Sequence, residues 1–180
     1  SRAEFAPDEP SNAECGLRFA LEDDPLEVMK MGLWFDTCLS PGNMNFFSTV
    51  ANAADANKRL LVGRDSRGTA QARCLLAITD SWHLLGFHVY AHENGKVVSA
   101  VVREILLELA KEIRISPAPS GSVRTLVAPA WYDDGPLDLT GQLTRLREGG
   151  DLEVRLEQAA PEHAFDVVTN GLGVDVIEAA

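Results

Sequence analysis

The clearest pattern in the chain is an alternation of apolar and polar positions between residues 59 and 92. Arg59–Arg64, Thr69–Thr79 and Trp82–His92 each show this period of two, which is typical of half-buried β-strands. Short runs rich in Asp, Ser and Gly separate the three segments. Because turns this short join antiparallel neighbours, the pattern predicts a three-stranded antiparallel meander.

The period changes to 3.6 after residue 95, which predicts an amphipathic helix over Val97–Ile113 with one face packed on the sheet. Further elements are predicted from shorter patterns. These are strands at Gly16–Leu21 and Thr125–Ala128, helices at Pro25–Gly32 and about Asn45–Asn57, and weaker strands at Asp151–Gln158 and Phe165–Thr169. The order of elements predicts a mixed α/β (α+β) domain whose central, mostly antiparallel sheet is flanked by helices.

Composition fits one globular domain of 180 residues, with 46% hydrophobic and 24% charged residues. Residues 1–14 are rich in Pro, Asp and Glu, and we expect them to form a flexible acidic lead to a single domain over residues 15–180. The acidic lead and the absence of a starting Met also suggest a piece of a larger polypeptide.

The net charge and the spacing of the cysteines argue against several classes of function. The net charge of -11 repels phosphate backbones, so nucleic-acid binding is not expected. The three cysteines are widely spaced without a C-x-x-C pair, which argues against a zinc site and a disulfide scaffold. No apolar stretch approaches the roughly 18 residues that a spanning helix needs, so we expect a cytoplasmic protein that does not enter membranes.

The predicted order of elements from about Gly16 to Ala130 resembles the GCN5-related N-acetyltransferase (GNAT) family. That order is a strand, two helices, three antiparallel strands, a long helix and a further strand. The resemblance implies a cleft for acyl-coenzyme A between the Trp82–His92 strand and the strand after the long helix, and transfer of an acyl group to an amine.

In this family a glycine-rich loop at the start of the long helix holds the pyrophosphate with backbone amides. The corresponding residues here are Gly95, Lys96 and Val97, which the resemblance implies as cofactor-binding residues for acetyl-coenzyme A. Glu93 departs from the family pattern, because it places a negative charge beside the expected phosphates. The loop is therefore a degenerate version of the family's loop.

Three residues are candidate catalytic groups. His88 and Tyr90 lie on the strand that in such a cleft deprotonates the amine, and an imidazole suits proton transfer because its ordinary pKa is near 6.5. Cys38 precedes a turn and a helix, and a cysteine followed later by a strand histidine is the order of papain-like enzymes. A hydrolase or transferase using Cys38 and His88 is thus an alternative, as is a buried, unreactive cysteine.

Arg64 and Arg73 are candidate ligand-binding residues. They are expected to face each other across the first hairpin, forming a basic patch with Lys58 and Arg59 that could recognise a carboxylate or a phosphate. A non-catalytic module that binds a ligand or a protein is therefore a third hypothesis.

A further acidic group follows Trp131-Tyr132. Asp133, Asp134 and Asp138 lack the spacing of a calcium loop, which favours a solvated turn anchored by Trp131 over a metal site. The Trp131–Pro136 stretch and the one at Cys38 are similar to segments of large bacterial proteins, a resemblance that implies no activity.

Overall fold

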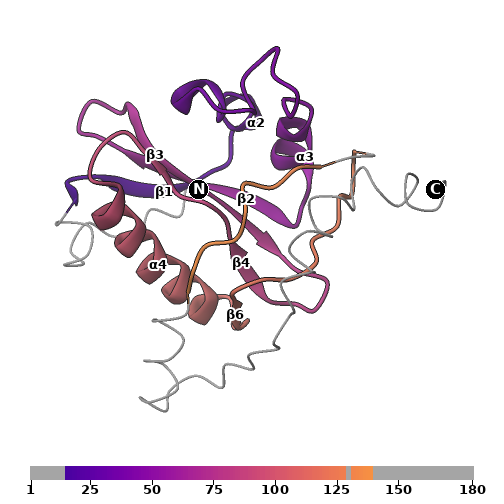
Figure 1. Cartoon of the computed structure of the whole chain (residues 1–180). Coiled ribbons are helices and arrows are strands. Elements are labelled where there is room, and N and C mark those ends of the chain that lie inside the picture. Colours follow the sequence, from indigo (N-terminus) through magenta and orange to yellow (C-terminus); the bar gives the residue numbers. More distant parts are fainter. Residues whose placement is uncertain (1–14, 129–130, 140–180) are drawn as a thin grey trace.

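The computed structural model describes residues 15–128 and 131–139. It is a mixed α/β fold in which a six-stranded sheet is covered by helices on both faces (Figure 1). The sheet follows the order β1-β2-β3-β4-β6, with β5 also paired to β3. The strands are β1 (Arg18–Glu22), β2 (Lys58–Arg64), β3 (Ala70–Ile78), β4 (Leu84–Gly86), β5 (Tyr90–Ala91) and β6 (Pro117–Ala118).

The predicted meander is confirmed, with antiparallel pairing from β2 to β3 and from β3 to β4. The predicted pairing of Arg64 with Arg73 is wrong. Arg73 lies opposite Val62, and Arg64 lies opposite Ala70 beyond a register shift next to Gly63. Even without the shift, this register would place Arg64 opposite Gln71, so it is the register of the whole hairpin that separates the two arginines, and alternation in one strand cannot reveal it.

Helices α2 (Pro25–Val28) and α3 (Ser48–Ala54) cover one face of the sheet, together with the 3-10 turn η1 (Leu33–Phe35) (Figure 1). Asp24 caps helix α2, since the Leu26 amide donates to the Asp24 carboxylate over 2.9 Å. Helix α3 is shorter than predicted, and the turn before it is held by the Asn43 side chain, which donates to the Thr37 carbonyl. The core on this face contains Leu60, Val62, Leu75, Leu85, Phe87 and Trp131.

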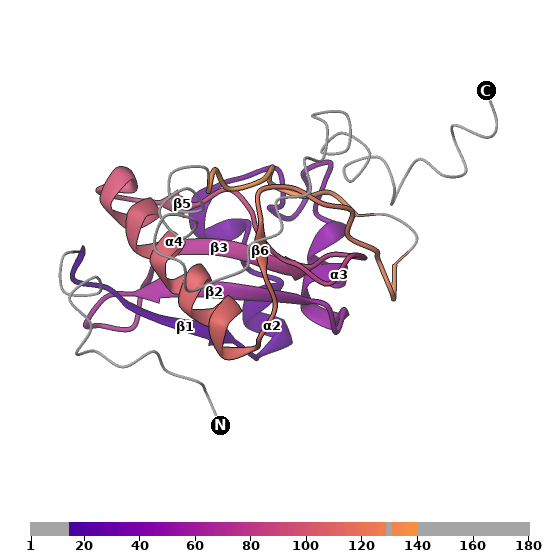
Figure 2. The same ribbon diagram turned by 90° about the horizontal axis from the view of Figure 1, so that it is seen from below.

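The long helix α4 (Gly95–Glu112) is confirmed and lies across the other face (Figure 2). Its buried stripe packs on β-strand residues such as Phe19, Leu61 and Leu76. No helix in the described ranges combines the length and apolar character that crossing a bilayer demands.

The strand predicted at Thr125–Ala128 is wrong, and the strand that runs parallel to β4 is β6, at residues 117–118. The amides of Leu126 and Val127 donate to the Asp55 carboxylate over 3.1 and 2.9 Å. Because these donors bind a side chain rather than a neighbouring strand, this apolar run forms a loop. The predicted strands Asp151–Gln158 and Phe165–Thr169 and the lead at residues 1–14 lie outside the described residues.

The predicted strand Trp82–His92 is interrupted between β4 and β5. Leu76 pairs with Gly86 and Arg73 pairs with Tyr90, so an advance of three residues along β3 corresponds to four residues from β4 to β5. The extra residue is a bulge, a feature that redirects side chains near functional sites. Here it leaves His88 exposed and places Tyr90 directly opposite Arg73.

Candidate functional site

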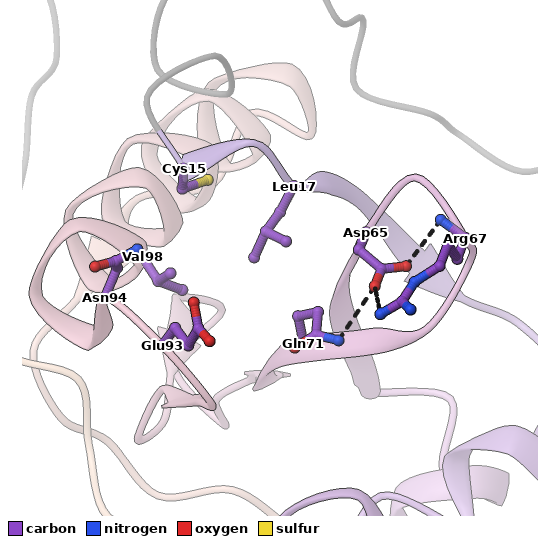
Figure 3. A pocket seen from close by; sticks show the side chains of 8 residues that line it. All are labelled: Cys15, Leu17, Asp65, Arg67, Gln71, Glu93, Asn94 and Val98. Atoms are coloured by element: carbon purple, nitrogen blue, oxygen red, sulfur yellow. Dashed lines mark hydrogen bonds and ion pairs between the residues drawn. The ribbon is translucent and has the colours of Figure 1, made fainter.

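The structure places most of the predicted site residues in two regions, one at the start of α4 and one around Arg73, while Arg64 lies apart from both. The first is an open pocket that borders the predicted cofactor loop, lined by Cys15, Leu17, Asp65, Arg67, Gln71, Glu93, Asn94 and Val98 (Figure 3). Gly95, Lys96 and Val97 are exposed beside it.

The polar groups of this pocket are a poor match for a pyrophosphate. Asp65 and Glu93 each supply a carboxylate to it. The one lining guanidinium, that of Arg67, is bound to the Asp65 carboxylate over 3.3 Å (Figure 3). Since carboxylates repel phosphate, the residues described at this place do not fit the diphosphate of coenzyme A.

The edge of β4 that faces β6 is also covered by the chain. The Leu84 amide donates to the Ser116 carbonyl next to β6, and two residues further the Gly86 carbonyl accepts from the Leu137 amide over 2.8 Å. Phe87 forms a bridge with Pro136. The segment around Pro136 and Leu137 therefore occupies the edge at which the resemblance implies an acyl-coenzyme A cleft.

The second region centres on Arg73, whose side chain is fully buried. Its Nη1 donates to Oδ2 of Asp134 over 2.6 Å, and its guanidinium carbon lies 4.0 Å from the centre of the Tyr90 ring and 5.9 Å from that of Phe35. Such an arrangement adds a cation–π attraction to a buried ion pair. The site thus joins β3, β5, η1 and the 131–139 segment.

Two of the three nitrogens of this guanidinium lack a hydrogen-bond partner in the part of the chain that the structure describes. Nε and Nη2 of Arg73 are buried and have no hydrogen-bond partner among the described residues. A buried donor left unpaired costs about 1–3 kcal/mol, and in native proteins such groups are few. Each of them therefore points to a group that pairs with it in the working protein.

Tyr90 connects the ion pair to one other candidate, His88. Its hydroxyl donates to Oδ1 of Asp134 over 3.3 Å, and burial, with the adjacent Asp134 charge, raises the Tyr90 pKa to about 12. The phenol therefore stays protonated at neutral pH and remains a donor. The His88 ring packs edge-on against Tyr90 at 4.7 Å, so His88 borders the site from its exposed side.

Cys38 lies on the same side, where its thiol interacts with the Tyr132 hydroxyl and raises the Tyr132 pKa together with burial, the larger cause. The contact recorded for His88 is with Tyr90, and in the described part of the chain no hydrogen bond joins His88 to Cys38. The geometry therefore lacks the imidazole partner that a nucleophilic cysteine requires.

In the predicted basic patch, each buried cation is bound to an acid. Lys58 pairs with Asp55 and Arg73 pairs with Asp134, all with side chains at most 1% exposed. Arg64 binds Glu22 over 2.6 Å and lies near Trp34, outside the Arg73 site. Asp133 and Asp134 are buried, so the prediction of a solvated turn is wrong, while Trp131 is buried as predicted.

The ion pair between Arg73 and Asp134 was not predicted from the sequence, because the two residues lie 61 positions apart. Asp133 is a second buried acid, whose pKa is raised to about 6 mainly by burial. Residues 15–128 and 131–139 contain no group of three or more His, Cys, Asp or Glu side chains that could hold a metal ion.

Searches against protein-family models, curated proteins and solved structures gave no match to this chain. The functional proposal therefore rests on the site itself.

Proposed function

We propose that this chain is a ligand-binding domain that recognises a small anionic molecule through the buried guanidinium of Arg73. The observation that carries the proposal is the pair of buried donors, Nε and Nη2, that have no partner within residues 15–128 and 131–139. A guanidinium is always charged and presents several N–H groups in a rigid plane, which makes it the preferred group for binding carboxylates and phosphates. In a low-dielectric site each new charge-assisted hydrogen bond is also stronger than it would be in water.

The contacts around Arg73 support ligand binding rather than catalysis. Phe35 and Tyr90 provide ring faces on the guanidinium, and Asp134 fixes it by one bond. Among the described contacts, Cys38 interacts with the Tyr132 hydroxyl and His88 packs against the Tyr90 ring, so neither is arranged as a nucleophile with its base. The domain therefore fits a non-catalytic ligand-binding module better than a cysteine hydrolase.

Anion recognition predicts that a thermal-shift titration with an equimolar panel of small anions raises the melting temperature of the wild-type chain for at least one member. Arg73→Lys should abolish that shift, because lysine keeps the charge but loses the planar set of donors. Arg64→Lys is the matched control on the same hairpin and should keep the shift. A panel without effect on the wild type, or an equal shift in both variants, contradicts the proposal.

Acyl transfer on a GNAT-like scaffold is the second candidate function. It is supported by the order of elements, with α2 and α3 between β1 and β2 and with α4 joining β4 to a parallel β6. If active, His88 or Tyr90 would handle the proton of the acceptor amine. The covered β4 edge and the carboxylates beside α4 argue against this candidate.

A titration with acetyl-coenzyme A separates the two candidates. We expect no rise in melting temperature up to about 1 mM acetyl-coenzyme A. Binding would be readily detected, because a ligand present at 100 times its Kd stabilises the folded state by about 2.7 kcal/mol. Free coenzyme A serves as the control for the nucleotide part. Saturable stabilisation by acetyl-coenzyme A that Lys96→Glu abolishes would instead support the acyltransferase.

A further inference from the structure

The donor pattern, the charge and the walls of the Arg73 site together point to one class of ligand. Resting on the proposed function, we infer that the anion is a monocarboxylate attached to a flat apolar group, held side-on by Nε and Nη2 of Arg73 between aromatic rings.

The first reason is the geometry of the unpaired donors. Because Nη1 is bound to Asp134, the free donors are Nε and Nη2, which share one edge of the guanidinium plane. Their N–H bonds run nearly parallel, a fork that matches the two oxygens of a planar carboxylate. A single neutral carbonyl oxygen would have to be shared by both donors and would bring no charge to pair with the guanidinium.

The second reason is the charge balance. Arg73 already faces the Asp134 carboxylate, and Asp133 is a further buried acid in the same turn. Arg64 is engaged with Glu22, and Lys58 is engaged with Asp55. Because Asp134 already neutralises Arg73, every negative charge that a ligand brings is an excess charge in a buried site, so a ligand with one charge is favoured over a phosphate dianion with two.

The third reason is the nature of the walls. The guanidinium is fully buried, and the two rings that lie against it, those of Phe35 and Tyr90, are half-buried. The exposed His92 ring stacks on Phe35 at 4.5 Å and extends this aromatic wall. Aromatic rings favour offset stacking or edge contact with another flat ring, which selects a flat apolar group next to the carboxylate.

Calorimetric titrations with benzoate, benzamide, acetate and inorganic phosphate test the inference on the wild type, Arg73→Lys and Arg64→Lys. We expect benzoate to bind the wild type at least about tenfold tighter than each of the other probes, as the loss of one hydrogen bond to a charged group implies. Arg73→Lys should lose at least about tenfold in benzoate affinity, and Arg64→Lys should retain it.

Phe35→Leu provides a second test that does not alter the buried ion pair, with folding checked by circular dichroism. It should weaken benzoate more than acetate, because acetate has no ring to pack on the wall. Phosphate binding tighter than benzoate, and lost in Arg73→Lys, would overturn the carboxylate class and leave anion recognition intact. Absence of binding by all four probes, or binding unchanged in Arg73→Lys, would overturn both.

Discussion

Asp134→Asn is expected to lower the free energy of unfolding by about 3–5 kcal/mol, the usual cost of removing one partner from a buried ion pair. The variant keeps the size of the side chain but leaves the Arg73 charge buried without its counterion. It also weakens the acceptor of the Tyr90 hydroxyl. Urea denaturation at pH 7, followed by circular dichroism, measures the effect.

Asp133, next to Asp134, provides a control for which the opposite change in the free energy of unfolding is expected. The Asp133 pKa is raised to about 6, above its unfolded value, so the folded state favours the protonated acid. Its contribution to stability is therefore present at low pH and is lost as the pH rises through about 6. Asp133→Asn should stabilise the protein at pH 7–8, on the order of 1–3 kcal/mol, and have little effect near pH 4. Equal losses from both substitutions at pH 7 would show that the carboxyls are not distinguished in this way.

Asp55→Ala is expected to cost about 3–5 kcal/mol as well, because it removes the partner of a fully buried lysine. The Asp55 carboxylate also accepts from the Leu126 and Val127 amides. Its loss therefore releases the loop that lies on the ends of β2 and β3. Urea denaturation and amide exchange at Leu126 and Val127 report the two effects separately.

Asp80→Ala is the matched control, since Asp80 forms an ion pair with Arg124 in which both side chains are at least one-third exposed. Exposed pairs contribute at most about 1 kcal/mol, so this variant should stay close to the wild type. If Asp55→Ala lost no more stability than Asp80→Ala, the buried pair would not be a structural anchor.

Local patterns predicted much of the fold because they reflect local physics. The period-two alternation identified β2 and β3, and the period of 3.6 identified α4 to within two residues at each end. Thr125–Ala128 has the same β-like composition, yet its amides bind Asp55, about 70 residues earlier in the chain. A contact at that separation leaves no trace in the local pattern.

The candidate site was predicted in part. Arg73, Tyr90, His88 and Cys38 were candidates from residue type, and the structure brings them to one side of the sheet. Their grouping depends on the bulge between β4 and β5 and on the pairing of Arg73 with Asp134. Neither feature follows from periodicity, since a bulge changes register without changing composition.

Nitrogen-15 NMR of arginine side chains tests the central claim most directly. The Arg73 Nε–H signal, assigned by its absence in Arg73→Lys, should be shielded from solvent exchange and should move on saturation with benzoate. The signal of Arg64, which is bound to Glu22, should stay in place. An Arg73 signal that stays unchanged while benzoate binds would contradict the assignment of this guanidinium as the recognition group.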